Sequence, residues 1–334
     1  MLVTHINSTK LFAGLEGAKG IVLALSGGPD SVAALALLAD WAKAKGSPRL
    51  FAATFDHGLR ATSRAEAEQC AALCQSLGVA HQILTWTGDK PATRIQEVAR
   101  DARYRALVAH AKDMGTDYLV TGHHADDQVE TILFRMMRGS SIGGLAGMRQ
   151  ISARDGIVHA RPFLTLRKSD LIAICSARGL TTIADPSNED PRFARTQMRR
   201  LAGLLEDAGM TPDSFTRLAA RAARADEALS AAAAQLASDA LITRDATTTH
   251  LQGQLVLAAP AEIALRLLMA EITRLGQAPR LEQAEPLADD LRAALSAHAP
   301  LRATLGGALV DLKRDSVLVI TREPPRRAGP DADA

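Results

Sequence analysis

Cysteine is scarce in this sequence: the 334 residues include three, Cys70, Cys74 and Cys175. Three thiols cannot all pair with one another, and their spacing matches no zinc-binding or redox motif. We interpret them as reduced thiols in packed positions, because free cysteine commonly packs as a small hydrophobic residue. Aromatic residues are also few, at 3%, while alanine is frequent, which favours helix-rich packing over a β-sandwich.

A long apolar segment is missing as well. No run of roughly 18 apolar residues occurs, and the first residues lack the apolar core and cleavage site of a secretory signal. The composition, 47% hydrophobic and 23% charged, is that of a globular chain and excludes extensive disorder. We expect a cytoplasmic protein with no membrane partner.

Neither sign of charge dominates the chain. The net charge of +2 does not by itself indicate a nucleic-acid partner. Between residues 192 and 224, however, seven arginines stand against three acidic residues. This stretch either meets phosphates or forms a solvated helix face, and charge alone favours the solvated face.

Short apolar strands alternate with helices through the first half of the chain. Residues 21–25 form an apolar run, followed by a loop and by a helix that is apolar nearly all round. The same order recurs with strands expected at 50–55, 81–85 and 118–121 and helices near 63–77, 93–112 and 126–138. This alternation predicts an α/β fold with a parallel, doubly wound sheet, in which ligands bind at the carboxyl ends of the strands.

The second half is expected to be mostly helical at first and then mixed. Thr211 and Pro212 are typical of a helix start and open an alanine-rich helix that reaches about residue 240. Further elements are expected as a strand near 158–161, helices at 165–179, 261–276 and 282–297, and a closing hairpin of 301–305 with 308–321. We predict a catalytic domain at 1–205, a helical connector at 206–240, a small α+β domain at 241–323 and a disordered tail at 324–334.

The string S-G-G-P-D-S lies directly between the first strand and the first helix. Backbone amides and the positive end of a helix dipole bind anions at such a place. Two glycines permit close phosphate approach, two serines add hydroxyl donors, and Asp30 is a candidate ligand for Mg²⁺. The alternative is a glycine turn with a helix cap, and the string is not a Walker loop. The candidate phosphate-binding residues are Ser26, Gly27, Gly28, Pro29, Asp30 and Ser31.

The string G-H-H-A-D-D-Q-V-E-T at 122–131 ends the fourth strand and opens the next helix. Asp127 and Glu130 are three residues apart, so they share one helical face and can hold a cation such as an ammonium group. Alternatively, the carboxylates balance the helix dipole and His123 is a packed core residue. The number of ionisable side chains in one strand-end loop favours the functional interpretation.

The S-G-G-x-D-S loop resembles that of the PP-loop ATP pyrophosphatases, which activate a substrate oxygen by adenylylation and release pyrophosphate. With residues 122–131 and four further segments, the sequence resembles the tRNA(Ile)-lysidine synthases over about residues 20–200. The four segments are D-H-G-L-R at 56–60, A-R with R-Y at 99–104, R-G-S-S-I-G-G-L-A-G-M at 138–148 and D-P-S-N at 185–188. The length implies a short form, with a PP-loop domain and one C-terminal domain.

The resemblance implies an ATP-dependent ligation. ATP and free lysine would convert the first anticodon cytidine of the isoleucine tRNA with a CAU anticodon to lysidine, releasing AMP and pyrophosphate. Asp30 would hold Mg²⁺, and Asp127 and Glu130 would bind the lysine amine, one of them accepting its proton. These three carboxylates are the predicted catalytic residues.

The resemblance also implies further binding residues. The nucleotide is expected beside Asp56, His57, Gly122 and His123. The backbone of the tRNA is expected at three arginines and at the C-terminal domain. The three are Arg195, Arg199 and Arg200. No base-stacking platform is identified, and the sequence leaves the oligomeric state open, with a homodimer as one candidate.

Two positions depart from the family pattern. Ser141 stands where the family usually has a second glycine after R-G-S. Thr196 stands where an asparagine often follows the arginine of the family's R-N-x-[IL]-R string.

One rival interpretation is a tRNA sulfurtransferase on the same fold. That chemistry needs nucleophilic cysteines or a cysteine-bound cluster, and no C-x-x-C occurs. A second rival, a nucleotide sensor without catalysis, would be expected to lack Asp30 or the carboxylates of 122–131.

Overall fold

The structure is a computed structural model that describes residues 8–46, 48–88, 90–91, 93–183 and 194–323. The chain divides into two compact units. Unit 1 comprises Met1–Arg138 and Ala146–Ala219, and unit 2 comprises Gly139–Leu145 and Ala220–Ala334. The predicted domain boundaries near residues 205 and 240 stay predictions. The D-P-S-N string at 185–188 and the tail at 324–334 lie outside the described residues.

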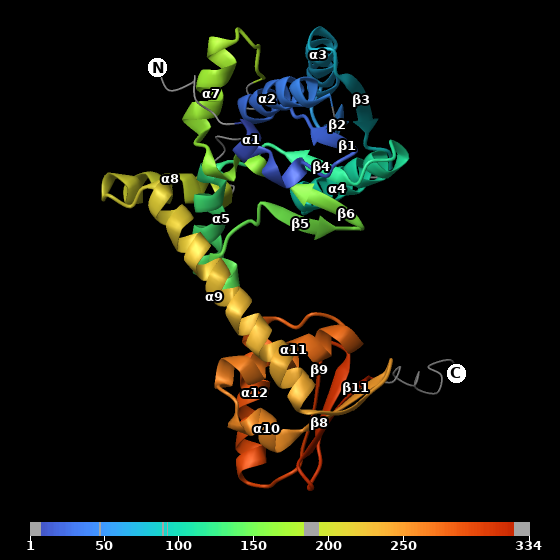
Figure 1. The fold of residues 1–334 in the computed structure, drawn as a ribbon, viewed down its shortest axis with the longest axis vertical. Coiled ribbons are helices and arrows are strands. Elements are labelled where there is room, and N and C mark those ends of the chain that lie inside the picture. The colour runs from blue at the N-terminus through green and yellow to red at the C-terminus, as the bar shows by residue number, and fades with distance from the viewer. Residues whose placement is uncertain (1–7, 47, 89, 92, 184–193, 324–334) are drawn as a thin grey trace. The chain divides into compact units, whose positions relative to one another are not determined.

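Unit 1 is built on a six-stranded sheet with the order β3-β2-β1-β4-β6-β5 (Figure 1). Five strands run parallel, and β5 pairs antiparallel with β6. The strands are β1 (Gly20–Ala24), β2 (Arg49–Asp56), β3 (Ala80–Thr85), β4 (Tyr118–Thr121), β5 (Ile151–Arg154) and β6 (Ile157–Ala160). The strands predicted from the apolar runs are therefore confirmed.

Strand β5 was not predicted. It joins β6 through Asp155 and Gly156, whose φ angles are both positive, at 48° and 83°. A D-G pair between two short strands is a hairpin signal, because both turn residues tolerate positive φ. The sequence therefore contains the information for this hairpin.

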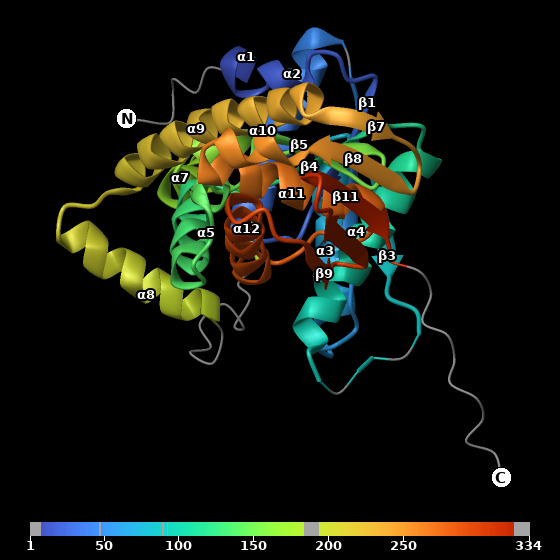
Figure 2. The same cartoon turned by 90° about the horizontal axis from the view of Figure 1, so that it is seen from below.

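Helices cover both faces of the sheet in unit 1. The main ones are α2 (Pro29–Lys45), α3 (Ser63–Ser76), α4 (Ile95–Asp113), α5 (Ala125–Met137), α7 (Lys168–Ala177) and α8 (Ala194–Asp207). Short helices are α1 (Ser8–Leu11), η2 (Ala13–Leu15) and η3 (Pro162–Thr165). Helix α8 contacts α5, and both views show the two helices next to each other (Figures 1 and 2).

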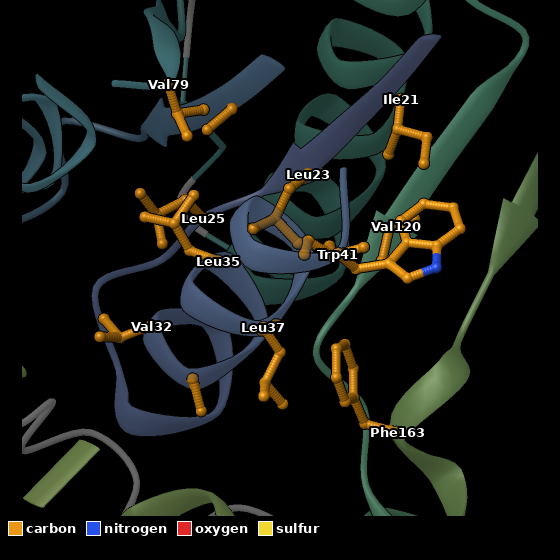
Figure 3. Packing of buried hydrophobic residues seen from close by; sticks show 14 of the residues in the cluster. Ile21, Leu23, Leu25, Val32, Leu35, Leu37, Trp41, Val79, Val120 and Phe163 are labelled. Carbon is orange, nitrogen blue, oxygen red and sulfur yellow. The ribbon is translucent and has the colours of Figure 1, made fainter. Parts of the chain in front are cut away.

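Neighbouring residues of β1 pack on opposite faces of the sheet, which explains why the strand is apolar throughout. Ile21 and Leu23 belong to one buried cluster with residues of α2, α3 and α7 (Figure 3). Val22 and Ala24 belong to a second cluster with Leu107 and its neighbours on α4. Because each face is covered by helices, the doubly wound α/β prediction is confirmed.

Helix α2 is the central element of the first cluster. It begins at Pro29 after the N-cap Gly28 and ends at Gly46, which adopts the left-handed conformation at a φ of 68°. Leu35 is fully buried and Trp41 is nearly so, on different sides of the helix (Figure 3). The predicted burial all round α2 is confirmed for Ser31–Leu38, whereas Asp40 and Lys43 in the C-terminal half are exposed.

Unit 2 contains a five-stranded antiparallel sheet with the order β7-β8-β11-β10-β9. Its strands are β7 (Leu241–Arg244), β8 (Thr248–Gln252), β9 (Leu301–Leu305), β10 (Ala308–Leu312) and β11 (Val317–Arg322). The helices are α6 (Ile142–Leu145), α10 (Gly253–Ala258), α11 (Ala261–Leu275) and α12 (Leu281–Ser296), and α9 (Pro212–Asp239) begins in unit 1. The predicted α+β character, the connector helix and α11 and α12 are confirmed.

The prediction for the closing hairpin was wrong in part. The segment expected as one strand at 308–321 is two strands, because a polar turn at 313–316 interrupts it and Ser316 has a φ of 62°. Strands β7 and β8 and helix α10 were also missed. Across the described residues, none of the helices has the length and apolar character needed to cross a membrane.

Adjacent residues on α7 give a matched test of the first cluster. Leu171 is 0% exposed and Ile172 is 46% exposed. We expect Leu171→Ala to lower the free energy of unfolding of unit 1 by about 2–5 kcal/mol, and Ile172→Ala by less than about 1 kcal/mol. Both tryptophans, Trp41 and Trp86, lie in unit 1, so urea unfolding followed by tryptophan fluorescence reports this unit. Equal losses in the two variants would contradict the packing described.

Candidate active site

The loop between β1 and α2 is held in shape by Ser31. The hydroxyl of this buried residue donates to the carbonyl oxygen of Gly28 at 3.0 Å and accepts from the amide of Ser26 at 3.1 Å. The Ser26 hydroxyl lies 3.1 Å from the same oxygen. The Ser31 hydroxyl is therefore engaged by the loop itself, and Ser26 is the serine of this loop that lines the cavity described below.

The two glycines of the loop differ in backbone conformation and in the space around them. Gly27 has a φ of 82°, and a Cβ atom there would lie 2.4 Å from Cδ1 of Ile183. Gly28 has ordinary angles, and a Cβ atom there would meet only the Ser26 hydroxyl, at 3.8 Å. The protein thus requires glycine at 27 for its own backbone, whereas the space beside Gly28 is open.

The first turn of α2 presents groups that suit a phosphate and its cation. Among the described residues, the amides of Gly27, Gly28 and Asp30 have no acceptor, and they lie at the positive end of a 17-residue helix. Oδ1 of Asp30 is buried, and no described group bonds to it. An orphaned carboxylate oxygen beside free amides fits a Mg²⁺ ligand, since this ion takes one or two carboxylates and completes its shell with phosphate oxygens and water.

His124 lies between three carboxylates and was not predicted as a site residue. Its Nε2 is 3.5 Å from both Asp30 and Asp127, and its Nδ1 is 3.4 Å from Asp126. Burial disfavours the charged imidazole, but the carboxylates of Asp126, Asp30 and Asp127 outweigh burial and raise the pKa of His124 to about 10. His124 is therefore an imidazolium that links the first turns of α2 and α5, including the predicted catalytic residues Asp30 and Asp127.

Gly122 positions α2. A Cβ atom at this residue would lie 2.9 Å from the carbonyl oxygen of Asp30, so only glycine lets the end of β4 approach the first turn of α2 this closely. Because β1 and β4 are neighbours in the sheet, the loops that follow them meet at this point.

Gln128 and Glu130, which belong to the string at 122–131 and lie on α5, have different partners. Gln128 is buried and clamps Met148, donating to its carbonyl oxygen at 2.8 Å and accepting from its amide at 2.6 Å. Glu130 is also buried and accepts a hydrogen bond from Nε of Arg199 on α8 at 2.5 Å. Asp127 and Glu130 therefore have different neighbours, and their joint role in lysine binding stays a prediction.

Asp56 and His57 end β2 and shape the next loop. Asp56 is buried, and its Oδ1 accepts from the amide of Gly58 at 3.0 Å and from the hydroxyl of Ser63 at 2.7 Å. Nδ1 of His57 accepts from the amide of Leu59 at 3.0 Å. The carboxylate of Asp56 is thus used within the loop, whereas His57 lines the cavity.

A cavity of about 1150 Å³ brings several predicted site residues together in unit 1. Ser26, His57, His123, Glu130 and Arg199 all line it, while Asp30 and Asp127 are not among its lining residues. The wall is strongly basic, with three glutamates, Glu66, Glu97 and Glu130, and seven arginines, Arg60, Arg100, Arg103, Arg135, Arg138, Arg161 and Arg199. Such a wall suits an anionic ligand.

The three arginines predicted to bind tRNA lie on α8 and differ in setting. Arg199 pairs with Glu130, and Arg200 is exposed. Of Arg195 only the backbone is described, within the first turn of α8. Tyr104 is 1% exposed and lies beneath the guanidinium groups of Arg100, Arg103 and Arg154. Tyr104 is therefore a structural residue here.

The cysteines are buried and free, as predicted. Burial raises the pKa of Cys74 to about 12, and it raises that of Cys70 and Cys175 as well. Thiols with raised pKa values are poor nucleophiles at neutral pH.

Comparison with known proteins identifies the family of this chain. A family model described as the PP-loop domain matches residues 2–203. Relatives from Rhodopseudomonas palustris and Methylobacterium nodulans, both named tRNA(Ile)-lysidine synthase, are 43% and 44% identical to this chain. The first match covers 97% of this chain and 96% of the relative, and the second covers 95% and 94%. The chain belongs to the tRNA(Ile)-lysidine synthase family, as its motifs predicted.

A solved structure supports the fold alone. The U34-tRNA thiolase NcsA from Methanococcus maripaludis matches with a TM-score of 0.55 and 17% identity, over 64% of this chain and 77% of that chain.

The open space beside Gly28 leads to a paired test. We expect Gly28→Ala to fold normally and to lower ATP-dependent pyrophosphate release by about tenfold or more, since the methyl group would displace a phosphate. Gly27→Ala should instead lower the free energy of unfolding by about 1–2 kcal/mol, because alanine resists positive φ. Pyrophosphate release and thermal unfolding of both variants check this. Full activity of a folded Gly28→Ala protein would contradict the phosphate position.

The buried His159 makes unit 1 sensitive to acid. Burial and the nearby Arg161 and Arg154 lower the pKa of this fully buried imidazole from 6.5 to about 3. The unfolded chain therefore binds one more proton than the folded chain between these two values, so stability falls as pH falls through this window.

The measurement is the free energy of unfolding of the wild type and of His159→Gln between about pH 6.5 and pH 4. We expect the wild type to lose up to about 1.4 kcal/mol more per pH unit than the variant. Parallel pH profiles would show that His159 takes up its proton in the folded protein as readily as in the unfolded one.

Proposed function

We propose that this chain is a ligase that joins lysine to C2 of the cytidine at the first anticodon position of the isoleucine tRNA with a CAU anticodon. ATP is split to AMP and pyrophosphate, and an adenylylated tRNA is the intermediate. The names of the full-length relatives support the substrates. The observation that carries the proposal is that Ser26 of the S-G-G-P-D-S loop and Glu130 of the string at 122–131 line the same basic cavity.

In the first half of the reaction, O2 of the cytosine attacks the α-phosphorus of ATP and the bond to the β-phosphate oxygen breaks. The amides of Gly27, Gly28 and Asp30 and the positive end of α2 hold the phosphates and stabilise the charge that develops on pyrophosphate. The Ser26 hydroxyl adds a donor at the cavity wall. Mg²⁺, with Asp30 as its proposed protein ligand, would neutralise charge on the phosphate oxygens.

In the second half, the ε-amine of lysine attacks C2 and AMP leaves. The amine reaches the site as an ammonium ion and must lose a proton before it can attack. We assign this proton to Asp127, whose side chain is 19% exposed, rather than to the more deeply buried Glu130, whose side chain is 7% exposed. Glu130 then adds negative charge near the ammonium group and holds α8 against α5.

The tRNA must place an unstacked anticodon base in the cavity. Arg200, exposed on α8, and Arg195 on the same helix are proposed to contact the tRNA backbone, while Arg199 acts through Glu130. We also propose a role in tRNA binding for the C-terminal domain at 241–323. Since tRNA, ATP and free lysine are cytoplasmic reactants, the proposal places the enzyme in the cytoplasm. A homodimer stays a prediction.

The deciding experiment incubates the pure protein with ATP, labelled lysine and an unmodified transcript of the CAU-anticodon isoleucine tRNA. We expect label in the tRNA, and none when uridine replaces the anticodon cytidine. Asp30→Asn should lower pyrophosphate release roughly a hundredfold or more. Asp40→Asn is the matched control, because Asp40 lies on the same helix and pairs with Arg178 at the surface. Thiolation of a tRNA without lysine incorporation would reject the proposal.

A further inference from the structure

A chain of hydrogen bonds runs from Arg161 to the wall of the nucleotide cavity. NH2 of Arg161 lies 2.8 Å from Nδ1 of His159, and Nε2 of His159 lies 3.0 Å from the hydroxyl oxygen of Thr121. The same oxygen is 2.6 Å from Nδ1 of His123. Strands β4 and β6 are parallel neighbours, with Leu119 opposite His159, and this register brings the groups into line.

The direction of every bond in this chain follows from its first member. A guanidinium group donates hydrogen bonds and cannot accept them. Nδ1 of His159 must therefore accept, so the ring carries its proton on Nε2. The Nε2–H group then donates to Thr121.

The direction of the hydrogen bond between Thr121 and His123 follows from the bond between His159 and Thr121. The Thr121 hydroxyl has one hydrogen, and it already accepts from His159. Thr121 is 2% exposed, so a hydroxyl hydrogen that found no acceptor would carry the cost of a buried unsatisfied donor. Donation to Nδ1 of His123 removes that cost and leaves the proton of His123 on Nε2.

The surroundings keep both rings neutral. Burial and neighbouring arginines lower the pKa of His159 to about 3 and that of His123 well below its usual value. The charged and titratable groups that face the two rings are Arg100, Arg103, Arg154, Arg161 and Tyr104. These arginines repel a further positive charge, so neither histidine is suited to act as an acid or a base near neutral pH.

We propose that Arg161, His159 and Thr121 are positioning residues that hold His123 in the Nε2–H form, as an uncharged hydrogen-bond donor to a nucleotide oxygen. This inference rests on the proposed function for the identity of the ligand. His123 lines the cavity together with Ser26, and its Nδ1 is already engaged, so the Nε2–H group is what the ring offers there. The donor contributes orientation, since a neutral group attracts an oxygen less strongly than the surrounding arginines do.

The tautomer can be observed without any substrate. Nitrogen NMR of protein labelled at its histidines distinguishes a protonated from an unprotonated ring nitrogen, and loss of signals in His123→Gln and His159→Gln assigns them. We expect Nε2–H for both rings at neutral pH. In Thr121→Val the Nδ1–H form of His123 should appear, while Thr116→Val, which removes another buried hydroxyl beside β4, should leave the tautomer unchanged. Nδ1–H in the wild type, or one unchanged form in Thr121→Val, would overturn the proposal.

The two amide replacements of His123 test the role in binding. The side-chain nitrogen of glutamine takes the place of Nε2, whereas that of asparagine takes the place of Nδ1. We expect His123→Gln to keep kcat/KM for ATP within about threefold of the wild type. His123→Asn and Thr121→Val should each lower kcat/KM by about 3- to 10-fold more than His123→Gln does.

Equal activity of the glutamine and asparagine variants would overturn the donor role. Absence of lysine incorporation by the wild type would instead reject the proposed function, and the NMR result would still decide the tautomer. The two failures are therefore distinguishable.

Discussion

The ion cluster of His124 with Asp30, Asp126 and Asp127 is the interaction on which the site depends. It ties together the first turns of two helices that follow neighbouring parallel strands, β1 and β4. Without the imidazolium, three half-buried carboxylates would repel one another. Gly122 allows the close approach, and the cluster makes it electrostatically stable. The phosphate loop and the proposed lysine carboxylate therefore lie side by side.

The site separates its charges in space. Three carboxylates and one imidazolium leave a net negative charge where Mg²⁺ and the lysine ammonium are proposed to bind. The cavity wall is basic, because its arginines outnumber its glutamates, and this charge suits anionic reactants. Under the proposed function, lysine and nucleotide would thus be drawn to adjacent regions of opposite sign.

Much of this arrangement could be predicted from the sequence, because its signals are local. The apolar runs, the position of S-G-G-P-D-S after the first strand and the carboxylates of 122–131 identified the sheet, the phosphate loop and the family. Tertiary contacts could not be inferred in the same way. The pairing of Glu130 with Arg199 joins residues 69 positions apart. The Ser31 hydroxyl and the Asp56 carboxylate form hydrogen bonds within their own loops, and these bonds depend on loop geometry. His124 stood inside the motif, but only the fold shows that it lies between Asp30 and Asp127.

The central claim is that the first turn of α2 binds the phosphates of ATP. The most direct measurement is an experimental structure of the full chain with Mg²⁺ and a non-hydrolysable ATP analogue. The account predicts phosphate oxygens on the amides of Gly27, Gly28 and Asp30, a metal ion on Oδ1 of Asp30, and His124 still between Asp30 and Asp127. A triphosphate bound elsewhere in the cavity, with the amides of the loop unoccupied, would contradict it.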